Sequence, residues 1–389
     1  MLDKRSLKEA FSEVFSSGGD IRGYFAPGRV NLIGEHIDYN GDHVFPCAIE
    51  SGTYVVARMR NDRKLCFFSE NFKDKGIMEL SLGSLFNDPK DSWANYPKGV
   101  FKTFMDHGYP IPDGFDIYVY GNIPGSGLSS SASLEVVVSN LIRDFFQLDI
   151  DDVMIARLSQ EAEVRFCHMN CGIMDQFACS NGKKDKAIFL DCQNLQYEYV
   201  PLKLSSYRLV VTNSNKPHSL VSSHYNDRRK ECEAALQDLR KKLDIRYLCQ
   251  LTPSQFEENK GLIQDSICQK RAGFAVYEEA RAKKALQALK KDDIMTFGKL
   301  INESGDGLRS EYEATCHEID ILVELSRRQK GCIGSRETGG GWGGNIISLV
   351  KEDCLEEFIR NVGEGYFQST GLRAQANILS VGNGGRRIF

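Results

Sequence analysis

The sequence predicts a soluble protein of the α/β class with two domains, and three observations support this prediction. The chain has 389 residues, more than one ordinary hydrophobic core accommodates. Strand patterns alternate with helix patterns in its first half. Near residues 195–205 the pattern changes from loops and strands to longer charged helices. We therefore predict two domains, 1–200 and 201–389.

Composition narrows the class of protein. Apolar residues make up 41% of the chain and charged residues 26%, which is typical of a soluble globular protein. A net charge of -4 gives no reason to expect nucleic acid or an anionic membrane as partner. No apolar run reaches the ~18 residues that span a bilayer. The N-terminal residues alternate in charge, unlike a secretory signal.

The cysteines agree with a cytoplasmic location. Twelve cysteines in a long chain without a secretory signal favour reduced thiols over disulfides. Cys167 and Cys171 lie four residues apart, but no second pair has zinc-ligand spacing, so a metal site there is disfavoured. We expect a cytoplasmic protein, and nothing in the sequence indicates an obligate protein partner.

The first predicted elements lead into a polar block. An amphipathic helix is expected over residues 6–15 and a strand near 23–26. The block at 27–40 then gathers four polar side chains on a glycine-punctuated loop: Arg29, Glu35, His36 and Asp38. Polar groups on such a loop more often bind a ligand than build a core, although each one alone is also explained by a surface salt bridge.

Two strands are expected around a turn at Asn61 and Asp62, within residues 54–68. The stretch 93–100 opens the next helix. Its Trp93 is one of two tryptophans, and it suits either a core position or a flat face on which a base stacks.

The stretch 124–133 reads Pro-Gly-Ser-Gly-Leu-Ser-Ser-Ser-Ala-Ser and joins an alternating strand at 115–120 to a helix at 134–145. A glycine-rich turn before a helix N-terminus gathers backbone N–H groups and a positive dipole end, which suits a polyphosphate. The common loop G-x-x-x-x-G-K-[ST] is absent. The alternative is a tight turn with serine caps.

A further helix is expected over 151–166, with Glu163 in its last turns. It leads into a loop at 171–177 that carries one acid, Asp175. An acid in this apolar setting can act as a base or a metal ligand, or it can cap a helix. Strands are expected over 185–192 and 199–213.

The second half is mostly helical until a second glycine-rich loop. Helices are expected over 225–243, twice within 270–305, and over 311–327, and the charges of the first of these indicate a solvated face. Residues 335–345 contain five glycines among six residues, which permits close backbone approach, and a strand follows at 346–350.

Three separated segments, beginning at Pro27, Pro124 and Glu337, resemble in order the motifs of the GHMP small-molecule kinases. The first, Gly-Arg-Val-Asn-Leu-Ile-Gly-Glu-His-Ile-Asp-Tyr-Asn at 28–40, is similar to the galactokinase signature except at Ile37. The similarity continues through 93–96, 171–177 and 213–215, and it covers nearly the whole chain.

The resemblance implies a two-domain GHMP kinase fold of the α+β type: a mixed-sheet N-terminal domain, an α/β C-terminal domain and an active site in the cleft between them. It also implies transfer of phosphate from ATP to the anomeric C1 hydroxyl of galactose, with Mg²⁺ as cofactor. Arg29 and Asp175 would be the catalytic pair, with Asp175 as base.

The resemblance also implies which residues bind the sugar, the nucleotide and the metal ion. The implied sugar-binding residues are Glu35, His36, Asp38, Gly172, Asp175 and Tyr225. The implied ATP-binding residues are Trp93, near adenine, and the loop Gly125, Ser126, Gly127, Leu128, Ser129, Ser130 and Ser131. The implied Mg²⁺ ligands are Ser131 and Glu163.

The chain departs from the family pattern at several positions. Ile37 replaces Thr, Asp42 replaces Gly, and Glu337 replaces Met. Gly305 also falls in a segment that differs from the galactokinase pattern. A carboxylate at Glu337, beside a loop expected to face phosphates, either points away, pairs with Arg336 or marks a changed site.

These differences leave alternatives to galactose open. One alternative is a 1-kinase for N-acetylgalactosamine, arabinose or galacturonate, although Glu35 and Asp38 argue against a sugar acid. The other is a galactokinase-like sensor that binds ATP and sugar without turnover. Such sensors lack residues of the serine loop, which is complete here.

Overall fold

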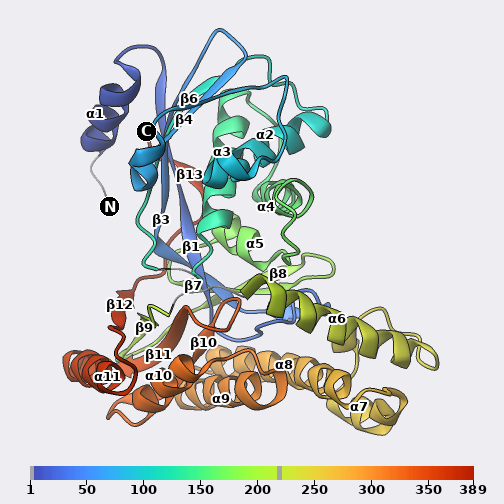
Figure 1. The fold of residues 1–389 in the computed structure, drawn as a ribbon. Coiled ribbons are helices and arrows are strands. Elements are labelled where there is room, and N and C mark those ends of the chain that lie inside the picture. The colour runs from blue at the N-terminus through green and yellow to red at the C-terminus, as the bar shows by residue number, and fades with distance from the viewer. Residues whose placement is uncertain (1–3, 126, 217–220) are drawn as a thin grey trace.

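The structure is a computed structural model that describes residues 4–125, 127–216 and 221–389 (Figure 1). Its first unit is built on a mixed six-stranded sheet of order β13-β1-β3-β6-β4-β5, in which β4 and β6 are parallel and the other pairs antiparallel. The strands are β1 (Ile21–Asn31), β3 (Pro46–Met59), β4 (Lys64–Ser69), β5 (Met78–Ser81), β6 (Phe115–Gly121) and β13 (Arg386–Arg387). The strands β3 and β4 form as expected, but β6 lies between them.

Helices cover both faces of this sheet (Figure 1). The helix α1 (Lys4–Phe15) lies on one face. The other face carries α2 (Asn95–Asp106), α3 (Ser130–Phe145), α4 (Asp152–Glu161) and α5 (Met174–Asn181). The first five residues of β6 are therefore all buried, so the prediction of a half-buried strand was wrong. Its polar residue Asp116 is neutralised by Arg58 and Arg60, each 2.7 Å away.

The second unit is a four-stranded antiparallel sheet between two helix layers. Its order is β10-β11-β9-β12, with β9 (Tyr207–Asn213), β10 (Cys332–Thr338), β11 (Asn345–Lys351) and β12 (Gln375–Leu379). One face packs on α8 (Ser266–Lys290) and α9 (Ile294–Gly307). The other packs on α10 (His317–Arg327) and α11 (Leu355–Thr370). The helices α6 (Val221–Arg240) and α7 (Pro253–Asn259) flank α8 (Figure 1).

A small sheet and a shared core join the two units. The sheet contains β2 (His43–Val44), β7 (Lys186–Asp191) and β8 (Tyr197–Pro201). Short helical turns complete the chain: η1 (Glu70–Lys75), η2 (Pro89–Ala94), η3 (Ala162–Phe166), η4 (Leu248–Gln250), η5 (Lys260–Leu262), η6 (Leu308–Tyr312) and η7 (Glu352–Cys354). One hydrophobic cluster runs from Val30 to Phe297 and Ile347, so the units share a continuous core.

The C-terminal residues return to the first unit. Val381 bridges Ile49, and β13 pairs with β1. The division after residue 200 falls just before the last residue of β8 and remains a prediction, but the range 201–389 includes β13, a strand of the first sheet. No helix in the described ranges is both long and apolar enough to cross a membrane.

Two local predictions were wrong in ways that matter for the site. The polar block begins inside β1, so Arg29 lies on a strand and not on a loop. Asp175 lies in the first turn of α5, where a loop was expected. Both side chains are therefore carried by regular secondary structure, which fixes their direction more firmly than a loop does.

Candidate active site

The three motif segments meet through their glycines. A β-carbon on Gly28 would lie 2.6 Å from the carbonyl oxygen of Leu128. A β-carbon on Gly339 would lie 2.7 Å from the carbonyl oxygen of Gly127. Only glycine permits backbones to approach this closely. The first and third motifs therefore both rest on the second.

Beside this junction lies a cavity of about 360 Å³. All residues predicted to bind the sugar, and the predicted catalytic pair, line it: Arg29, Glu35, His36, Asp38, Gly172, Asp175 and Tyr225. Its walls come from β1 and the loop after it, from α5 and α6, and from the third motif. Both units thus contribute to one cavity.

Asp175 is held by two partners across the first unit. Its Oδ1 accepts hydrogen bonds from Arg29 Nε at 2.8 Å and Nη2 at 2.7 Å, and its Oδ2 accepts one from Ser129 Oγ at 2.6 Å. No side-chain cap bond begins α5, so Asp175 is not a helix cap. Although burial lowers the pKa of the Arg29 guanidinium, the charges of Asp175 and Glu35 raise it further than burial lowers it.

Glu35 is firmly anchored at the edge of the cavity. Its carboxylate is 2% exposed and accepts from Gly339 N at 2.8 Å, Asn31 Nδ2 at 3.0 Å and Arg336 Nη2 at 3.3 Å. Thr338 Oγ1 also donates to Oε1 at 3.1 Å, so three of the four donors share Oε1, and Oε2, which accepts only from Asn31, has room for a ligand hydroxyl. The residue ties the first motif to the third.

His36 is a neutral imidazole with one free nitrogen. Burial, then the charges of Arg228 and Arg336, lower its pKa to about 3. Its Nδ1 lies 2.8 Å from the hydroxyl of Tyr39, whereas Nε2 is buried and has no partner among the described residues. A buried polar atom without a partner is costly, which suits a ligand hydroxyl at this point.

Asp38 lies against the backbone of Gly172. A β-carbon there would lie 1.8 Å from Asp38 Oδ2, so only glycine fits. Burial, and then the charge of Asp175, raise the pKa of Asp38 to about 7, although the Arg229 guanidinium opposes this shift. Beside it, the ring of Tyr225 is 5.5 Å from that of His36 and closes the cavity.

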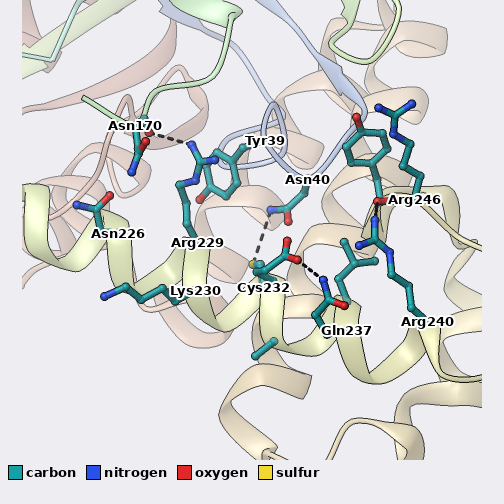
Figure 2. Close-up of a pocket in the computed structure, with 14 residues that line it drawn as sticks. Tyr39, Asn40, Asn170, Asn226, Arg229, Lys230, Cys232, Gln237, Arg240 and Arg246 are labelled. Atoms are coloured by element: carbon teal, nitrogen blue, oxygen red, sulfur yellow. Dashed lines mark hydrogen bonds between the residues drawn. The ribbon is translucent and has the colours of Figure 1, made fainter. Parts of the chain in front are cut away.

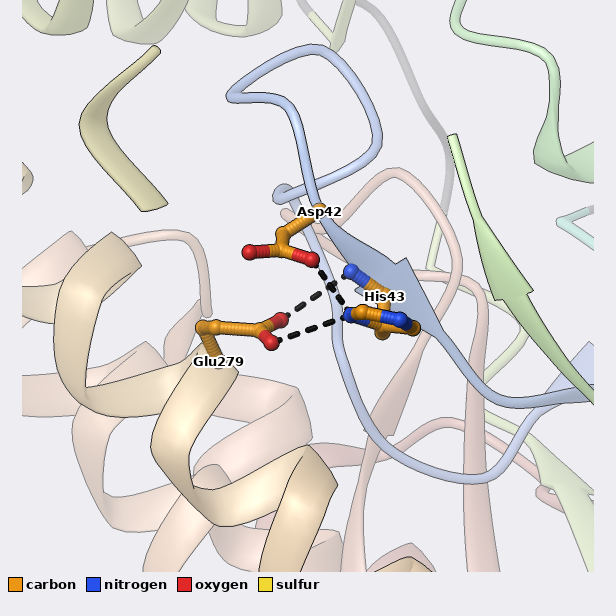
Figure 3. A group of neighbouring side chains, drawn as sticks. All are labelled: Asp42, His43 and Glu279. Atoms are coloured by element: carbon orange, nitrogen blue, oxygen red, sulfur yellow. Dashed lines mark hydrogen bonds and ion pairs between the residues drawn. The ribbon is translucent and has the colours of Figure 1, made fainter. Parts of the chain in front are cut away.

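Two consecutive carboxylates of α8 hold both ends of the sugar loop, residues 34–43. Glu278 accepts from Gly34 N at 2.9 Å, and Glu279 accepts from His43 N at 3.0 Å. The side chains of Asp42, His43 and Glu279 gather at the second end (Figure 3). Lys283 Nζ lies 2.6 Å from Glu279. With His43 protonated, two positive groups balance two carboxylates, so this cluster needs no metal.

The serine loop divides its side chains between two sides. Gly125 and Gly127 adopt φ of 78° and 87°, which glycine favours. Leu128 is fully buried in the core, so it can meet a nucleotide only through its backbone. Ser129 faces Asp175 and not the exposed side of the loop, where Ser130 begins α3. Ser126 lies outside the described residues.

Glu163 and Ser131 lie together, as a shared metal site requires. Burial and the charge of Asp175 raise the pKa of Glu163, and a hydrogen bond from Ser131 opposes the rise. Gln176 Nε2 donates to Glu163 Oε2 at 2.5 Å. Carboxylate and hydroxyl oxygens are ligands that Mg²⁺ accepts, so this pair fits the ion.

Trp93 is a core residue. Its side chain is 7% exposed and belongs to the cluster beneath the first sheet, with Phe72 parallel to it at 6.4 Å between ring centroids. A stacking face open to adenine is therefore not formed by this ring, and any contact would involve its edge. Its Nε1 has no partner among the described residues.

Glu337 neither faces the serine loop nor pairs with Arg336. It is 2% exposed, and its Oε1 accepts from Gly343 N at 3.1 Å within the third motif. Arg336 donates to the main-chain carbonyl of Glu337 and pairs with Glu35 instead. Burial raises the pKa of Glu337 well above its usual value.

Several residues of the site were not predicted. The cavity is also lined by His168, Met169, Asn170, Asn226 and Gly340. His168 has φ of 60°, an unusual backbone for histidine that no motif signals. The carboxylates Glu278 and Glu279 were also missed, because they belong to a helix with several other charged residues, among which two acids give no distinct signal.

A second cavity of about 770 Å³ lies along α6 (Figure 2). Arg229, Lys230, Arg240 and Arg246 contribute to its wall, and it shares Asn170 and Asn226 with the sugar cavity. Arg229 donates to the carbonyl of Asn170 at 2.9 Å and lies over the ring of Tyr39. The basic face of α6 is thus partly a wall and not only a solvated surface.

Family models match three stretches of the chain. The galactokinase galactose-binding signature matches residues 9–59, the GHMP kinases N terminal domain matches 95–183, and the GHMP kinases C terminal model matches 273–368. These stretches contain the sugar loop, the serine loop and the third motif, respectively.

Relatives match over the full length. The galactokinase of Fusobacterium nucleatum is 49% identical over 98% of this chain and 99% of that protein, and that of Bacillus subtilis is 46% identical over 99% of each. The crystal structure of Lactococcus lactis galactokinase complexed with galactose superimposes with a TM-score of 0.97 at 41% identity, covering 99% of both chains. A mevalonate kinase at 17% identity and TM-score 0.66 shares the fold.

Identity of this extent over the whole length, together with the convergence of the three motifs on one cavity, settles the family. This chain belongs to the galactokinases, within the GHMP kinases.

Proposed function

We propose that this protein transfers the γ-phosphoryl group of ATP to the C1 hydroxyl of galactose, giving α-galactose 1-phosphate. The observation that carries the proposal is Asp175, held by Arg29 and Ser129 on the wall of a cavity that suits a neutral sugar. The Lactococcus lactis relative in complex with galactose, at 41% identity, supports the same substrate.

In this proposal Asp175 orients the C1 hydroxyl and receives its proton. Its side chain is 29% exposed, so the carboxylate is accessible from the cavity while Arg29 and Ser129 fix its direction. Phosphoryl transfer depends mainly on positioning and charge stabilisation, so a fixed carboxylate beside a guanidinium serves both needs. Arg29 also faces the carbonyl of Gly127, which links the pair to the serine loop.

The nucleotide would lie on the other side of the same loop. The N-terminus of α3 and the backbone of residues 127–131 offer N–H donors for its phosphates. Ser131 and Glu163 would hold Mg²⁺, which neutralises charge on the phosphates when bound. We propose the exposed edge of Trp93 as the adenine contact.

The sugar cavity favours galactose over charged sugars. Glu35 and Asp38 are acceptors for hydroxyl groups. Among the described residues, Arg29 is the one arginine or lysine that lines the cavity, and it is already paired with Asp175. Galacturonate is therefore disfavoured. N-acetylgalactosamine and arabinose remain competing substrates, and a sensor without turnover remains the competing class.

Replacement of Asp175 by Asn tests the mechanism. We expect kcat to fall by about 10²–10⁴-fold, the typical contribution of general-base catalysis, with galactose affinity within tenfold of wild type by calorimetry. The exposed Asp149, replaced by Asn, is the matched control. Equal turnover by the two variants would remove Asp175 from the mechanism.

A sugar panel tests the substrate. ADP release should be fastest with galactose, and phosphorus and carbon NMR of the product should place the phosphate on C1. If arabinose or N-acetylgalactosamine is turned over faster than galactose, that sugar is the substrate and the proposal of galactose is wrong. Joint binding of ATP and galactose without ADP release would establish the sensor.

A further inference from the structure

One buried carboxylate beside the predicted metal ligands has no assigned role. Glu135 lies four residues after Ser131 on α3, so the two side chains share one face of that helix. The residue has no exposed surface. Its Oε1 accepts no hydrogen bond from an amide, hydroxyl or cationic group of the described residues, and its carboxyl lies within hydrogen-bonding distance of the Glu163 carboxyl. A buried carboxylate oxygen without a donor is costly and calls for an explanation.

One amide connects Glu135 to the predicted Mg²⁺ ligand Glu163. Gln176 Nε2 donates to Glu135 Oε2 at 3.0 Å and to Glu163 Oε2 at 2.5 Å. Gln176 is itself fully buried and follows Asp175 on α5. The two hydrogens of a single amide group thus hold two carboxylates at once, and they leave the remaining oxygen of Glu135 without a donor.

The surroundings of these carboxylates lack positive charge. Burial, followed by the charge of Glu163, raises the pKa of Glu135 well above its usual value. The guanidinium of Arg29 is committed to Asp175, and the ammonium of Lys98 is committed to Asp91 at 2.5 Å. Buried carboxylates are normally paired with cations or bind metals, so the described residues leave this pair incomplete.

We propose that Glu135 is a positioning residue of the Mg²⁺ site, which it completes together with Ser131 and Glu163. Through Oε2 it fixes the Gln176 amide that orients Glu163, and through Oε1 it offers an acceptor for a water molecule of the hydrated ion. Mg²⁺ retains several waters in proteins, and groups that orient its ligands typically change affinity 10–100-fold. This inference rests on the proposed kinase function.

Metal binding itself is the readout. The dissociation constant of Mn²⁺, a spectroscopic substitute for Mg²⁺, is measured by electron paramagnetic resonance in the presence of a non-hydrolysable ATP analogue. We expect Glu135→Gln to raise this constant 10–100-fold, while Glu135→Asp, which keeps the charge, lies between it and wild type. Glu161→Gln, on the neighbouring helix, removes a charge outside the site and should match wild type.

Thermal unfolding separates this role from a purely structural one. Without metal, Glu135→Gln should unfold at the same temperature as wild type or higher, because Gln has the same shape as Glu and removes the repulsion between two neighbouring buried carboxyl groups. Addition of Mn²⁺ and the ATP analogue should raise the unfolding temperature of wild type more than that of the variant. Galactose affinity should stay within twofold.

The outcomes distinguish this inference from the proposed function. Wild-type protein that binds no Mn²⁺ with the ATP analogue would contradict the metal-dependent kinase function. Wild-type binding with an unchanged constant in Glu135→Gln would overturn the role of Glu135 alone. If Glu135→Gln fails to fold, Glu135→Asp supplies the comparison, and its Mn²⁺ constant within twofold of wild type would overturn the role as well.

Discussion

The sugar side and the metal side of the active site differ in how their buried carboxylates are satisfied. On the sugar side, Glu35 accepts from a backbone N–H, an amide and a guanidinium. On the metal side, Glu135 accepts from one amide and keeps an oxygen without a donor among the described residues. Both oxygens of Glu35 thus have a donor, whereas only one oxygen of Glu135 has one.

The buried polar atoms without partners on each side therefore indicate whether that side binds a neutral or a charged ligand. On the sugar side the free atom is Nε2 of the neutral His36, which suits an uncharged hydroxyl. On the metal side the free atoms are Oε1 of Glu135 and Oε1 of Gln176, both acceptors, which suits a cation and its waters. The protein alone therefore offers a neutral site on the sugar side and a cation site on the metal side.

Matched substitutions of the two carboxylates should give the largest contrast. Glu35→Gln leaves the fully buried Arg336 without its carboxylate, so we expect a loss of about 3–5 kcal/mol in the free energy of unfolding, measured by urea denaturation. Glu135→Gln should lose nothing without metal. Equal destabilisation by both would show that the two sides do not differ.

Gly172→Ala should affect the sugar side alone. The added methyl group would overlap the Asp38 carboxylate, 1.8 Å away. Overpacking of this kind costs about 1–3 kcal/mol, so KM for galactose should rise roughly 10–100-fold. KM for ATP should stay within twofold. A parallel rise for both substrates in steady-state kinetics would argue for general unfolding.

The cluster of Asp42, His43 and Glu279, which holds the second end of the sugar loop, should weaken at alkaline pH. Although burial lowers the pKa of His43, its hydrogen bonds to Asp42 and Glu279 raise it to about 9 from 6.5. Its contribution to stability is therefore complete below pH 6.5 and lost as pH rises through 9. We expect a loss of about 3 kcal/mol in the free energy of unfolding.

His43→Gln provides the control for this pH dependence. The variant should be less stable than wild type at pH 6 and should lack the loss between pH 6.5 and 9. Lys283, which faces the same carboxylates, stays charged over this range. A wild-type urea midpoint independent of pH over this interval would contradict the ion-pair anchor.

The smallest effect is expected at Glu337. This residue is an exception to the comparison of the two sides, because its unpartnered oxygen is not assigned to a ligand. Its Oε2 also lacks a partner among the described residues, yet it lies in the third motif, where the family usually has Met. Glu337→Met should raise stability by about 1 kcal/mol with unchanged galactose kinetics. A large change in KM would mean that this oxygen, too, receives a ligand.

The sequence predicted the reaction better than it predicted the geometry of the site. Because the order and spacing of the motifs are specific, every residue that the resemblance assigned to the sugar and to the catalytic pair lines the cavity, although other lining residues were missed. The Arg29–Asp175 pair spans 146 positions, so only the resemblance, and no local pattern, could connect them. Glu135 was missed because it lies within an apolar helix run, where one acid gives no periodic signal.

Other misses also have physical causes. The glycine at 172 suggested that a loop continued through Asp175, but α5 starts at Met174. The resemblance assigned Leu128 to the nucleotide together with the rest of the loop; that role stays a prediction for its backbone, because its side chain fills the shared core. Neighbours in sequence can thus face opposite sides of one loop, as Leu128 and Ser130 do.

The glycine contacts between the three motifs bear on attempts to redesign this enzyme. Because Gly28 and Gly339 rest directly on the main chain of residues 127–128, no side chain is present to absorb a misfit. A specificity loop transplanted from another sugar kinase would have to match its new neighbours at the level of backbone path. Such grafts should succeed only when all three segments are exchanged as one module.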